Sequence, residues 1–352
     1  MKPTALLRHF LEQRALLHFG RQPESTPLRG ANANDPDWIQ ASPVRIQRAL
    51  DRALALPSGG WYVVGATRAI GDRPERHVID GRELVAWRGA DGAPRIAPAE
   101  CPHMGADLAC GRVEKGQLIC PWHGLALGDA GHGRWKPCRV HDDGVLTWVR
   151  LAGPQEEVTE TPILPPRPTH FFDGVIRLDA QCEPADVLAN RLDPWHGAWY
   201  HPHSFGRLRV LEEREDSVLV RVSFRVLGPL AVEVDATFHC PDPRTIVMTI
   251  VEGEGTGSVV ETHATPIGPG RTAVIEATLA TSDREGFLGA LGARALVRPL
   301  IEARARRLWI EDTAYAERTY AVRRRNQLTV LRPSASLAAE SSPRALPPRP
   351  TD

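Results

Sequence analysis

Two pairs of metal-binding residue types lie close together in the chain. Cys101 and His103 form the first pair, and Cys120 and His123 form the second after sixteen intervening residues. Thiolate and imidazole groups bind transition metals such as zinc and iron. A structural zinc site is one interpretation, but zinc modules usually pair Cys with Cys and His with His, whereas here each pair is mixed. Mixed pairs suit a two-iron cluster in which each loop gives its Cys to one iron and its His to the other.

In order and spacing, these residues resemble the Cys-x-His…Cys-x2-His motif of the Rieske family. The flanking segments HMGA and CPWHG also look like the cluster-binding loops of that family. The resemblance implies that Cys101, His103, Cys120 and His123 hold a Rieske [2Fe–2S] cluster, in which two His replace two Cys on one iron.

The neighbouring residues favour one branch of that family. Rieske proteins of respiratory and photosynthetic complexes carry a loop disulfide and a serine that donates a hydrogen bond to the cluster. This chain has other residues at those positions, namely Ala106, Trp122 and Leu125. Fewer hydrogen bonds to the sulfurs imply a lower potential, which is the pattern of Rieske oxygenases and their ferredoxins.

A second group of candidate ligands lies in the segment NRLDPWHGAWYHPH. It resembles the Asp-x2-His-x4-His segment of Rieske oxygenases, which implies that His196 and His201 bind a mononuclear Fe(II). His203 is a competitor for the second position. The resemblance also implies that Asp193 is a hydrogen-bonded bridge from an iron-ligand His to a cluster His, across a neighbouring subunit of a head-to-tail homotrimer.

The third iron ligand is expected downstream, because a face of two His and one carboxylate holds Fe(II) and leaves positions for dioxygen and substrate. In the stretch WIEDTAYAE, Asp312 matches the family segment best. Glu302, Glu311 and Glu317 stay open as alternatives, since any of these carboxylates could instead pair with the arginines nearby.

The elements that must position these residues follow from local patterns. Short apolar runs broken by Gly, Pro and Asp predict a small all-β domain, and later β-like runs followed by a helical stretch at 284–325 predict an antiparallel sheet packed on a long helix. The expected fold class is therefore α+β, with a Rieske domain followed by a helix-grip catalytic domain.

Helices are also expected at 4–19 and 44–56, and strands at 217–227, 231–239, 245–252, 257–264 and 271–281. The expected boundaries are an N-terminal helical extension at 1–57, the Rieske domain at 58–152, a linker at 153–169, the mononuclear-iron domain at 170–332 and a disordered tail at 333–352.

Composition limits the function classes. The 352 residues are 42% apolar, which excludes disorder of the whole chain. The 43 basic and 43 acidic side chains cancel, which argues against nucleic acid as a partner. Six cysteines are too few for a disulfide scaffold. We expect Cys110 to be a buried thiol, and the remaining non-ligand cysteines, Cys138, Cys182 and Cys240, to be ordinary thiols.

The absence of a long apolar run and of a signal-peptide pattern predicts a cytoplasmic protein without a membrane span. The resemblance implies the oxygenase component of a bacterial multicomponent system, a monooxygenase or dioxygenase that uses O2. Its electrons would come from a separate NAD(P)H-dependent reductase, with or without a ferredoxin, and pass through His123 and Asp193. No nucleotide fingerprint is visible in this chain, so the reductase is expected to be a separate chain. A Rieske electron-transfer protein without oxygenase activity is the alternative.

The substrate is expected to be a small apolar organic molecule. Segments such as PSGGWYVV and RLDPWHGAWYHPHSF look like a bacterial subgroup associated with carotenoid-type isoprenoid metabolism, which points to an isoprenoid-like substrate. Some strand residues could line an apolar cavity, although core packing is the expected use of most of them: Val218, Val220, Phe224, Val232, Val234, Phe238 and Ile246.

Overall fold

The structure, a computed structural model, describes residues 41–153, 156–227 and 230–330. The predicted helix at 4–19 and the tail at 333–352 lie outside the described residues. The first described helix, α3 (Pro43–Leu54), begins where the Ser42 side chain accepts a hydrogen bond from the N–H of Arg45, with Pro43 in the first turn. No helix in the described ranges has the length and apolar character needed to span a membrane.

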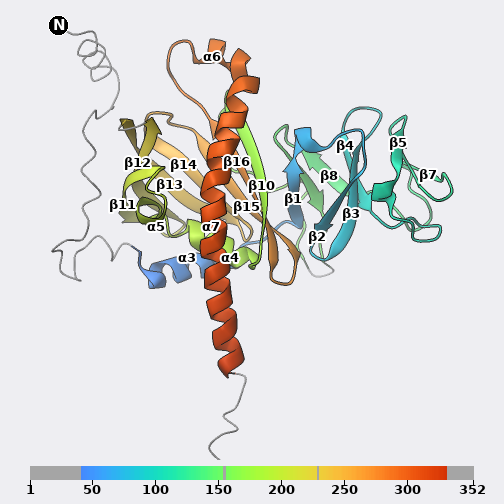
Figure 1. The fold of residues 1–352 in the computed structure, drawn as a ribbon, viewed down its shortest axis with the longest axis horizontal. Coiled ribbons are helices and arrows are strands. Elements are labelled where there is room, and N and C mark those ends of the chain that lie inside the picture. The colour runs from blue at the N-terminus through green and yellow to red at the C-terminus, as the bar shows by residue number, and fades with distance from the viewer. Residues whose placement is uncertain (1–40, 154–155, 228–229, 331–352) are drawn as a thin grey trace, which may run out of the picture.

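The first half of the described chain forms three small antiparallel sheets of three strands each (Figure 1). Their strand orders are β1-β9-β8, β2-β3-β4 and β5-β6-β7. The strands are short because turn residues interrupt the chain every few positions. Their bounds are β1 (Trp61–Ala66), β2 (Glu75–Ile79), β3 (Arg82–Arg88), β4 (Pro94–Pro98), β5 (Arg112–Glu114), β6 (Gln117–Ile119), β7 (Ala126–Leu127), β8 (Arg139–Asp142) and β9 (Leu146–Arg150).

The second half forms one seven-stranded antiparallel sheet in the order β10-β16-β15-β14-β13-β12-β11. Alternate residues of its strands face two different cores: Val274 packs with Trp309 of the long helix, whereas Ile275 packs with Trp61 and Trp148 of the first domain. Both faces of the central strands are therefore buried. The bounds are β10 (Phe172–Ala180), β11 (Phe205–Glu213), β12 (Ser217–Leu227), β13 (Leu230–Asp242), β14 (Thr245–Gly253), β15 (Val259–Gly268) and β16 (Arg271–Ala280).

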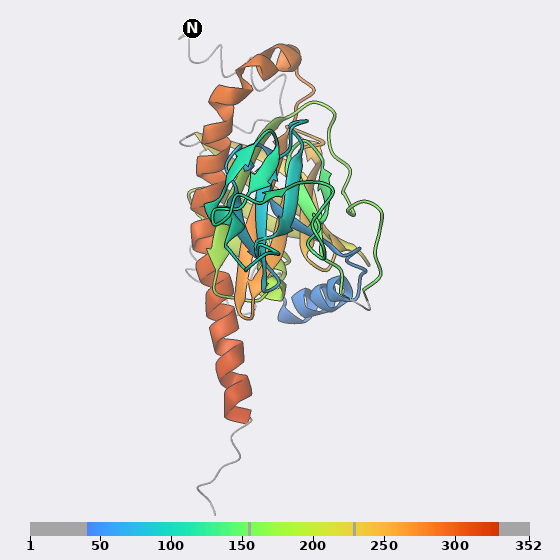
Figure 2. The ribbon, with the colours of Figure 1, turned by 90° about the vertical axis from the view of Figure 1, so that its right-hand side faces the viewer.

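The long helix α7 (Arg294–Val330) lies along the sheet and extends beyond it at its C-terminal end (Figure 2). It follows α6 (Phe287–Ala290) and a short 3-10 turn, so the helical segment starts a few residues later than position 284. The N-cap residue Gly286 has a φ of +91°, which a continuous right-handed helix does not allow. Two shorter helices, α4 (Pro184–Arg191) and α5 (His196–Tyr200), lie between β10 and β11 in the chain. The predicted α+β architecture is confirmed.

Gly174 on β10 allows α7 to pack closely on the sheet. A Cβ at this position would lie 2.6 Å from Cγ2 of Ile301, a distance that real Cβ atoms do not tolerate. The sheet and the helix can therefore approach only because position 174 lacks a side chain.

Candidate functional site

The two predicted cluster loops adopt the same turn. The N–H of Gly105 donates to the carbonyl oxygen of Cys101 at 2.9 Å, and the N–H of Gly124 donates to that of Cys120 at 3.1 Å. Both glycines have positive φ angles, +76° and +70°, which favour glycine. A glycine four residues after each cysteine thus closes each loop. The two loops therefore place their Cys and His residues on backbones of similar conformation.

The cysteine thiols are buried and the histidine rings are exposed. Cys101 and Cys120 are 2% and 1% exposed, and each sulfur accepts hydrogen bonds from two backbone N–H groups of its own loop. Such N–H···S bonds stabilise negative charge on sulfur, as a cluster needs. The rings of His103 and His123 meet edge to face with 4.9 Å between their centroids. The donor set of two sulfurs and two imidazoles therefore fits a [2Fe–2S] group.

A single zinc ion fits these four residues less well. In the part of the chain that the structure describes, the one group of three or more such donors with all atoms within 4.8 Å is His196, His201 and Asp312. The two Cys and two His do not converge on one point, as a tetrahedral zinc site requires.

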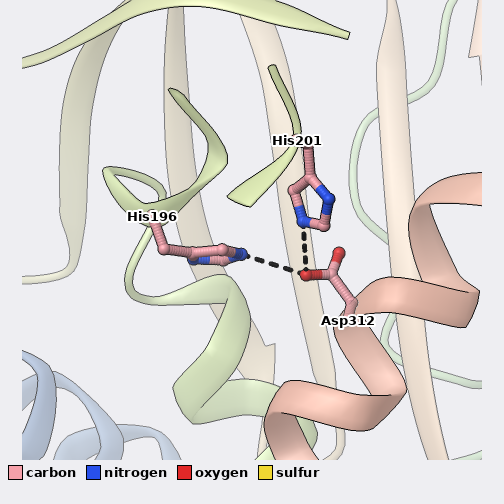
Figure 3. A group of neighbouring side chains, drawn as sticks. All are labelled: His196, His201 and Asp312. Atoms are coloured by element: carbon pink, nitrogen blue, oxygen red, sulfur yellow. Dashed lines mark hydrogen bonds and ion pairs between the residues drawn. The ribbon is translucent and has the colours of Figure 1, made fainter. Parts of the chain in front are cut away.

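His196, His201 and Asp312 converge from two parts of the chain (Figure 3). His196 begins α5 and His201 follows it, whereas Asp312 comes from the middle of α7. The Nε2 atoms of the two histidines lie 3.0 and 2.9 Å from the same oxygen, Oδ1 of Asp312. Two imidazole nitrogens and one carboxylate oxygen on one side of a site form the donor set that mononuclear Fe(II) takes.

The second ring nitrogen, Nδ1, of each histidine also has a hydrogen-bond partner. Nδ1 of His201 lies 2.5 Å from Oε2 of Glu311, and Nδ1 of His196 bonds to the backbone carbonyl oxygen of Asp193. Metal-binding histidines usually donate their other N–H to a carboxylate or carbonyl oxygen, which fixes the tautomer that presents Nε2. The residues present therefore fit a mononuclear iron.

Electrostatics support a permanently charged carboxylate at this point. Burial alone would raise the pKa of the Asp312 carboxyl, but hydrogen bonds from His196 and His201 outweigh burial and hold this pKa well below its usual range. Burial would lower the pKa of His201, yet the hydrogen bond and charge of Asp312, with Glu311, raise it. Asp312 is 3% exposed, so this charge is almost fully shielded from water.

The open alternatives for the third ligand lie elsewhere. Glu302 bonds to Arg68 and to the N–H of Val175, and Glu317 accepts from the N–H of Gln181. Glu311 contacts the outer nitrogen of His201 and so orients this ring.

His203, the competitor for the second histidine position, stands outside the triad. Its Nδ1 lies 3.9 Å from Oε1 of Glu311. The triad therefore takes its second imidazole from His201.

Asp193 lies beside the triad in a buried, partly unsatisfied environment. One carboxylate oxygen, Oδ2, is 3.7 Å from Nδ1 of His196 and accepts a hydrogen bond from Tyr315 at 3.4 Å. The other oxygen, Oδ1, is buried and has no hydrogen-bond partner among the described residues. Burial raises the pKa of this carboxyl. Arg45 of α3, a buried guanidinium, contributes an opposing charge.

A cavity of about 190 Å³ opens next to the triad, between the sheet and α7. Of the strand residues expected to line a cavity, Phe224 and Phe238 do so, and Val218, Val220 and Val234 pack in the adjacent core instead. Val232 packs against this core and Ile246 is buried in another. The apolar lining consists mainly of Phe205, Leu208, Val222, Phe224, Phe238, Met248, Val260, Ile301, Ala305 and Leu308.

Several residues of this site were not assigned from the sequence. Asn190 donates to Oδ1 of Asp312 at 3.0 Å, and its place on α4, one helical turn before Asp193, is a signal that could have found it. Glu276 and Arg191 line the cavity, and no pattern in the sequence indicated this position.

The prediction for Cys110 was wrong: this thiol is exposed, because it ends a short surface turn and bonds to Asp107.

Two family models match the chain. A model of the Rieske [2Fe-2S] domain matches residues 60–151. A model described as a domain of unknown function (DUF5914) matches residues 153–327.

Known relatives share part of the sequence. The aminopyrrolnitrin oxygenase PrnD of Pseudomonas fluorescens is 36% identical over 90 residues, or 26% of this chain and 25% of that protein. The vanillate O-demethylase oxygenase subunit of Pseudomonas sp. (strain HR199 / DSM 7063) is 42% identical over 77 residues, or 21% of each protein. The chain thus spans about a quarter or less of the length of these curated relatives.

Similar solved structures cover more of the chain and define its fold. A crystal structure of dicamba monooxygenase bound to dicamba matches 80% of this chain and 92% of that chain, with a TM-score of 0.61 and 18% identity. The Rieske domain implies a [2Fe–2S] cluster as cofactor, and the neighbouring triad has the donors for a non-haem iron. The chain therefore contains a Rieske [2Fe-2S] domain and shares the two-domain fold of dicamba monooxygenase.

Proposed function

We propose that this protein is the oxygenase component of a multicomponent system and that it hydroxylates an organic substrate with O2. In this proposal Cys101, His103, Cys120 and His123 hold the Rieske cluster, and the mononuclear Fe(II) is bound by His196, His201 and Asp312. The observation that carries it is a buried two-histidine, one-carboxylate triad that opens into an apolar cavity. When bound, the cluster supplies single electrons and the Fe(II) supplies oxygen activation.

The protein side chains position the reaction and keep water out. The carbonyl of Asp193 and the carboxylate of Glu311 hold the outer nitrogens of the two histidines. Asn190 holds Oδ1 of Asp312. The apolar wall of the cavity binds the substrate by removing its surface from water, at roughly 25 cal/mol per Å² of apolar surface.

The cavity size limits how much of a substrate enters. A cavity of about 150 Å³ is known to accept benzene, so the 190 Å³ here has room for about one substituted ring. The named activities of two relatives concern vanillate and aminopyrrolnitrin, and dicamba monooxygenase was solved with dicamba bound. For an isoprenoid or carotenoid-like substrate, we propose that an end ring enters the cavity while the remaining chain extends through its mouth.

We further propose that the working unit is a head-to-tail homotrimer. The β5–β7 sheet, whose loops carry Cys120 and His123, lies at one end of the molecule, and α5 lies at the other (Figure 1). His123 is exposed, and Asp193 lies beside His196 with a small part of its surface still open to solvent. In the proposed trimer, His123 of one copy would contact the Asp193 carboxylate of the next.

Electrons are proposed to come from a separate NAD(P)H-dependent reductase, directly or through a ferredoxin, which would suit work in the cytoplasm. A solved complex of the carbazole 1,9a-dioxygenase oxygenase with its ferredoxin matches 77% of this chain at a TM-score of 0.51. That match concerns the fold alone. The ferredoxin is a property of the carbazole enzyme, and its use by this chain is part of the proposal.

Iron and sulfide quantification combined with EPR tests the proposal. Anaerobically purified protein should contain about three irons and two sulfides per chain, and its reduced cluster should give a rhombic EPR signal. His196→Ala should lower the iron content to about two, keep the cluster signal and abolish ¹⁸O2 incorporation into product. The neighbouring His203→Ala is the matched control and should keep all three irons. About two irons in the wild-type protein would instead indicate an electron-transfer protein, and a colourless zinc-containing preparation would exclude both.

A further inference from the structure

The inner wall of the cavity carries a carboxyl group and a guanidinium group that the proposed oxygen chemistry does not use. The lining is mostly apolar, yet Glu276 of β16 and Arg191 of α4 both reach it. Burying a charged group costs several kcal/mol unless hydrogen bonds or charges compensate. Two such groups in an apolar cavity therefore need an explanation.

Glu276 is fixed in place but keeps hydrogen-bonding capacity. It is 6% exposed, and its Oε2 accepts a hydrogen bond from the indole N–H of Trp309 at 2.5 Å. Its other oxygen, Oε1, has a contact at 3.5 Å from the hydroxyl of Thr278, at the outer limit for such a bond. Oε1 can therefore accept a stronger hydrogen bond from a ligand in the cavity.

Neighbouring aromatic rings also fix the Arg191 side chain, and its Nε–H remains available as a hydrogen-bond donor. Its guanidinium carbon lies 5.7 Å from the ring centroid of Phe238 and 5.9 Å from that of Trp309, so two aromatic rings fix its position. Its Nε–H is buried and has no hydrogen-bond partner within the described ranges. Among the described residues, Arg191 acts on Glu276 through its charge, which lowers the pKa that burial raises, and not through a hydrogen bond, so the hydrogen-bonding capacity of both groups stays available.

We propose that Glu276 and Arg191 determine substrate specificity by binding a neutral hydroxyl group on the ring that enters the cavity. The hydroxyl donates its hydrogen to Oε1 of Glu276 and its oxygen accepts a hydrogen bond from Arg191. A hydroxyl satisfies both groups because it is donor and acceptor at once. A carboxylate cannot, since it has no hydrogen to donate to Oε1 of Glu276. The substrate class is thus a ring compound that already carries a phenol or alcohol group. This inference rests on the proposed function, because it assigns the substrate of the same cavity.

Binding of four ligands of similar size to the iron-loaded protein tests the inference under anaerobic conditions by calorimetry. 4-Methylphenol can donate and accept, 4-methylanisole can only accept, p-xylene can do neither, and 4-methylbenzoate is an anion. Hydrogen bonds to charged groups correspond to roughly a 10- to 100-fold gain in affinity. 4-Methylphenol should therefore bind about 10- to 100-fold more tightly than p-xylene, although p-xylene is the more apolar ligand. Equal or tighter binding of p-xylene to the wild-type protein would overturn the inference without any variant.

Two variants assign the effect to these residues. Glu276→Gln and Arg191→Met should each lower the ratio of 4-methylphenol to p-xylene affinity by about 10-fold, and Glu276→Gln should tighten 4-methylbenzoate binding. Retained p-xylene affinity shows that the cavity is intact. Glu254→Gln, at an exposed ion pair with Arg284 outside the cavity, is the matched control and should leave the ratio unchanged. An unchanged ratio in both cavity variants would refute the assignment. Iron content and product formation are separate measurements, so failure of the hydroxyl preference is distinguishable from failure of the oxygenase proposal.

Discussion

Replacing Arg167 with methionine should strongly destabilise the protein, because this residue links three parts of the chain. Its Nε and Nη2 atoms donate to the two oxygens of Glu261 on β15 at 2.5 and 2.6 Å. Its Nη1 atom lies 3.0 Å from Oδ1 of Asp143, in the turn between β8 and β9. The side chains of Arg167, Asp143 and Glu261 are 13%, 5% and 0% exposed. A segment before β10 is thus tied to both the first domain and the large sheet.

The size of the destabilisation follows from the carboxylates of Asp143 and Glu261, which lose their partner in Arg167→Met. Removing one partner of a buried ion pair typically costs about 3–5 kcal/mol, because the remaining charge is desolvated and unpaired. Arg167→Met should lower the free energy of unfolding in urea by about that amount. Arg139→Met is the matched control, since Arg139 pairs with Glu160 where both side chains are 49% and 79% exposed. The control should lose at most about 1 kcal/mol. A loss of less than about 1 kcal/mol for Arg167→Met would refute the reasoning.

The pH dependence of the difference in unfolding free energy between the wild-type protein and Arg167→Met provides a second test. Burial alone would raise the pKa values of Asp143 and Glu261, but hydrogen bonds from Arg167 outweigh burial and lower both. A carboxyl whose folded pKa is depressed stabilises the protein above its unfolded pKa, about 4, and loses this contribution as the pH falls through the folded value. In Arg167→Met the largest cause of this lowering of the two pKa values is removed. The stability difference from wild type should therefore be largest near neutral pH and shrink as the solution is acidified.

Three further expectations concern Asp193 and two strand glycines. Asp193→Asn should retain both metal centres and slow single-turnover electron transfer between them by about 10- to 100-fold; an unchanged rate would count against the proposed bridge. Gly174→Ala should cost about 1–3 kcal/mol in urea unfolding, because the new Cβ would lie 2.6 Å from Ile301, and an unaffected midpoint would disprove the close packing. Gly65→Ala, another strand glycine with nothing within 4 Å of the added Cβ, should be neutral or slightly stabilising in the same assay.

The cluster loops were predictable because their information is local. Each Cys, His and Gly lies within five residues of its partners, and the positive φ angles of Gly105 and Gly124 explain that spacing. The third carboxylate of the triad was less certain, because α7 carries several acidic residues and its register against the sheet is a tertiary property. Asp312 lies on the face of α7 that also buries Ala305, Trp309 and Ala316. Helical spacing from that apolar face would have favoured Asp312 over Glu311.

The cavity could not be predicted from the strands. Alternation along β12 separates one face from the other, but Val220 and Val222 lie on the same face and are both buried. A buried valine therefore looks the same in sequence whether it packs in a core, as Val220 does, or lines the cavity, as Val222 does. Which residues leave a space depends on the distance between the sheet and α7, and that distance depends on contacts such as Gly174 with Ile301.

The helix α7 couples metal binding to the proposed substrate recognition. Within two turns it supplies Trp309, which fixes Glu276, then Glu311 and Asp312 at the triad, and then Tyr315, which stacks on His196 with 5.0 Å between ring centroids. These four residues share one rigid element, whereas His196 begins α5, His201 follows it and Glu276 belongs to β16. A shift of the helix along the sheet would therefore move Asp312 away from the two histidines and Trp309 away from Glu276 at the same time. Changes that alter the packing of α7 on β10 should therefore alter the proposed position of hydroxylation as well as stability.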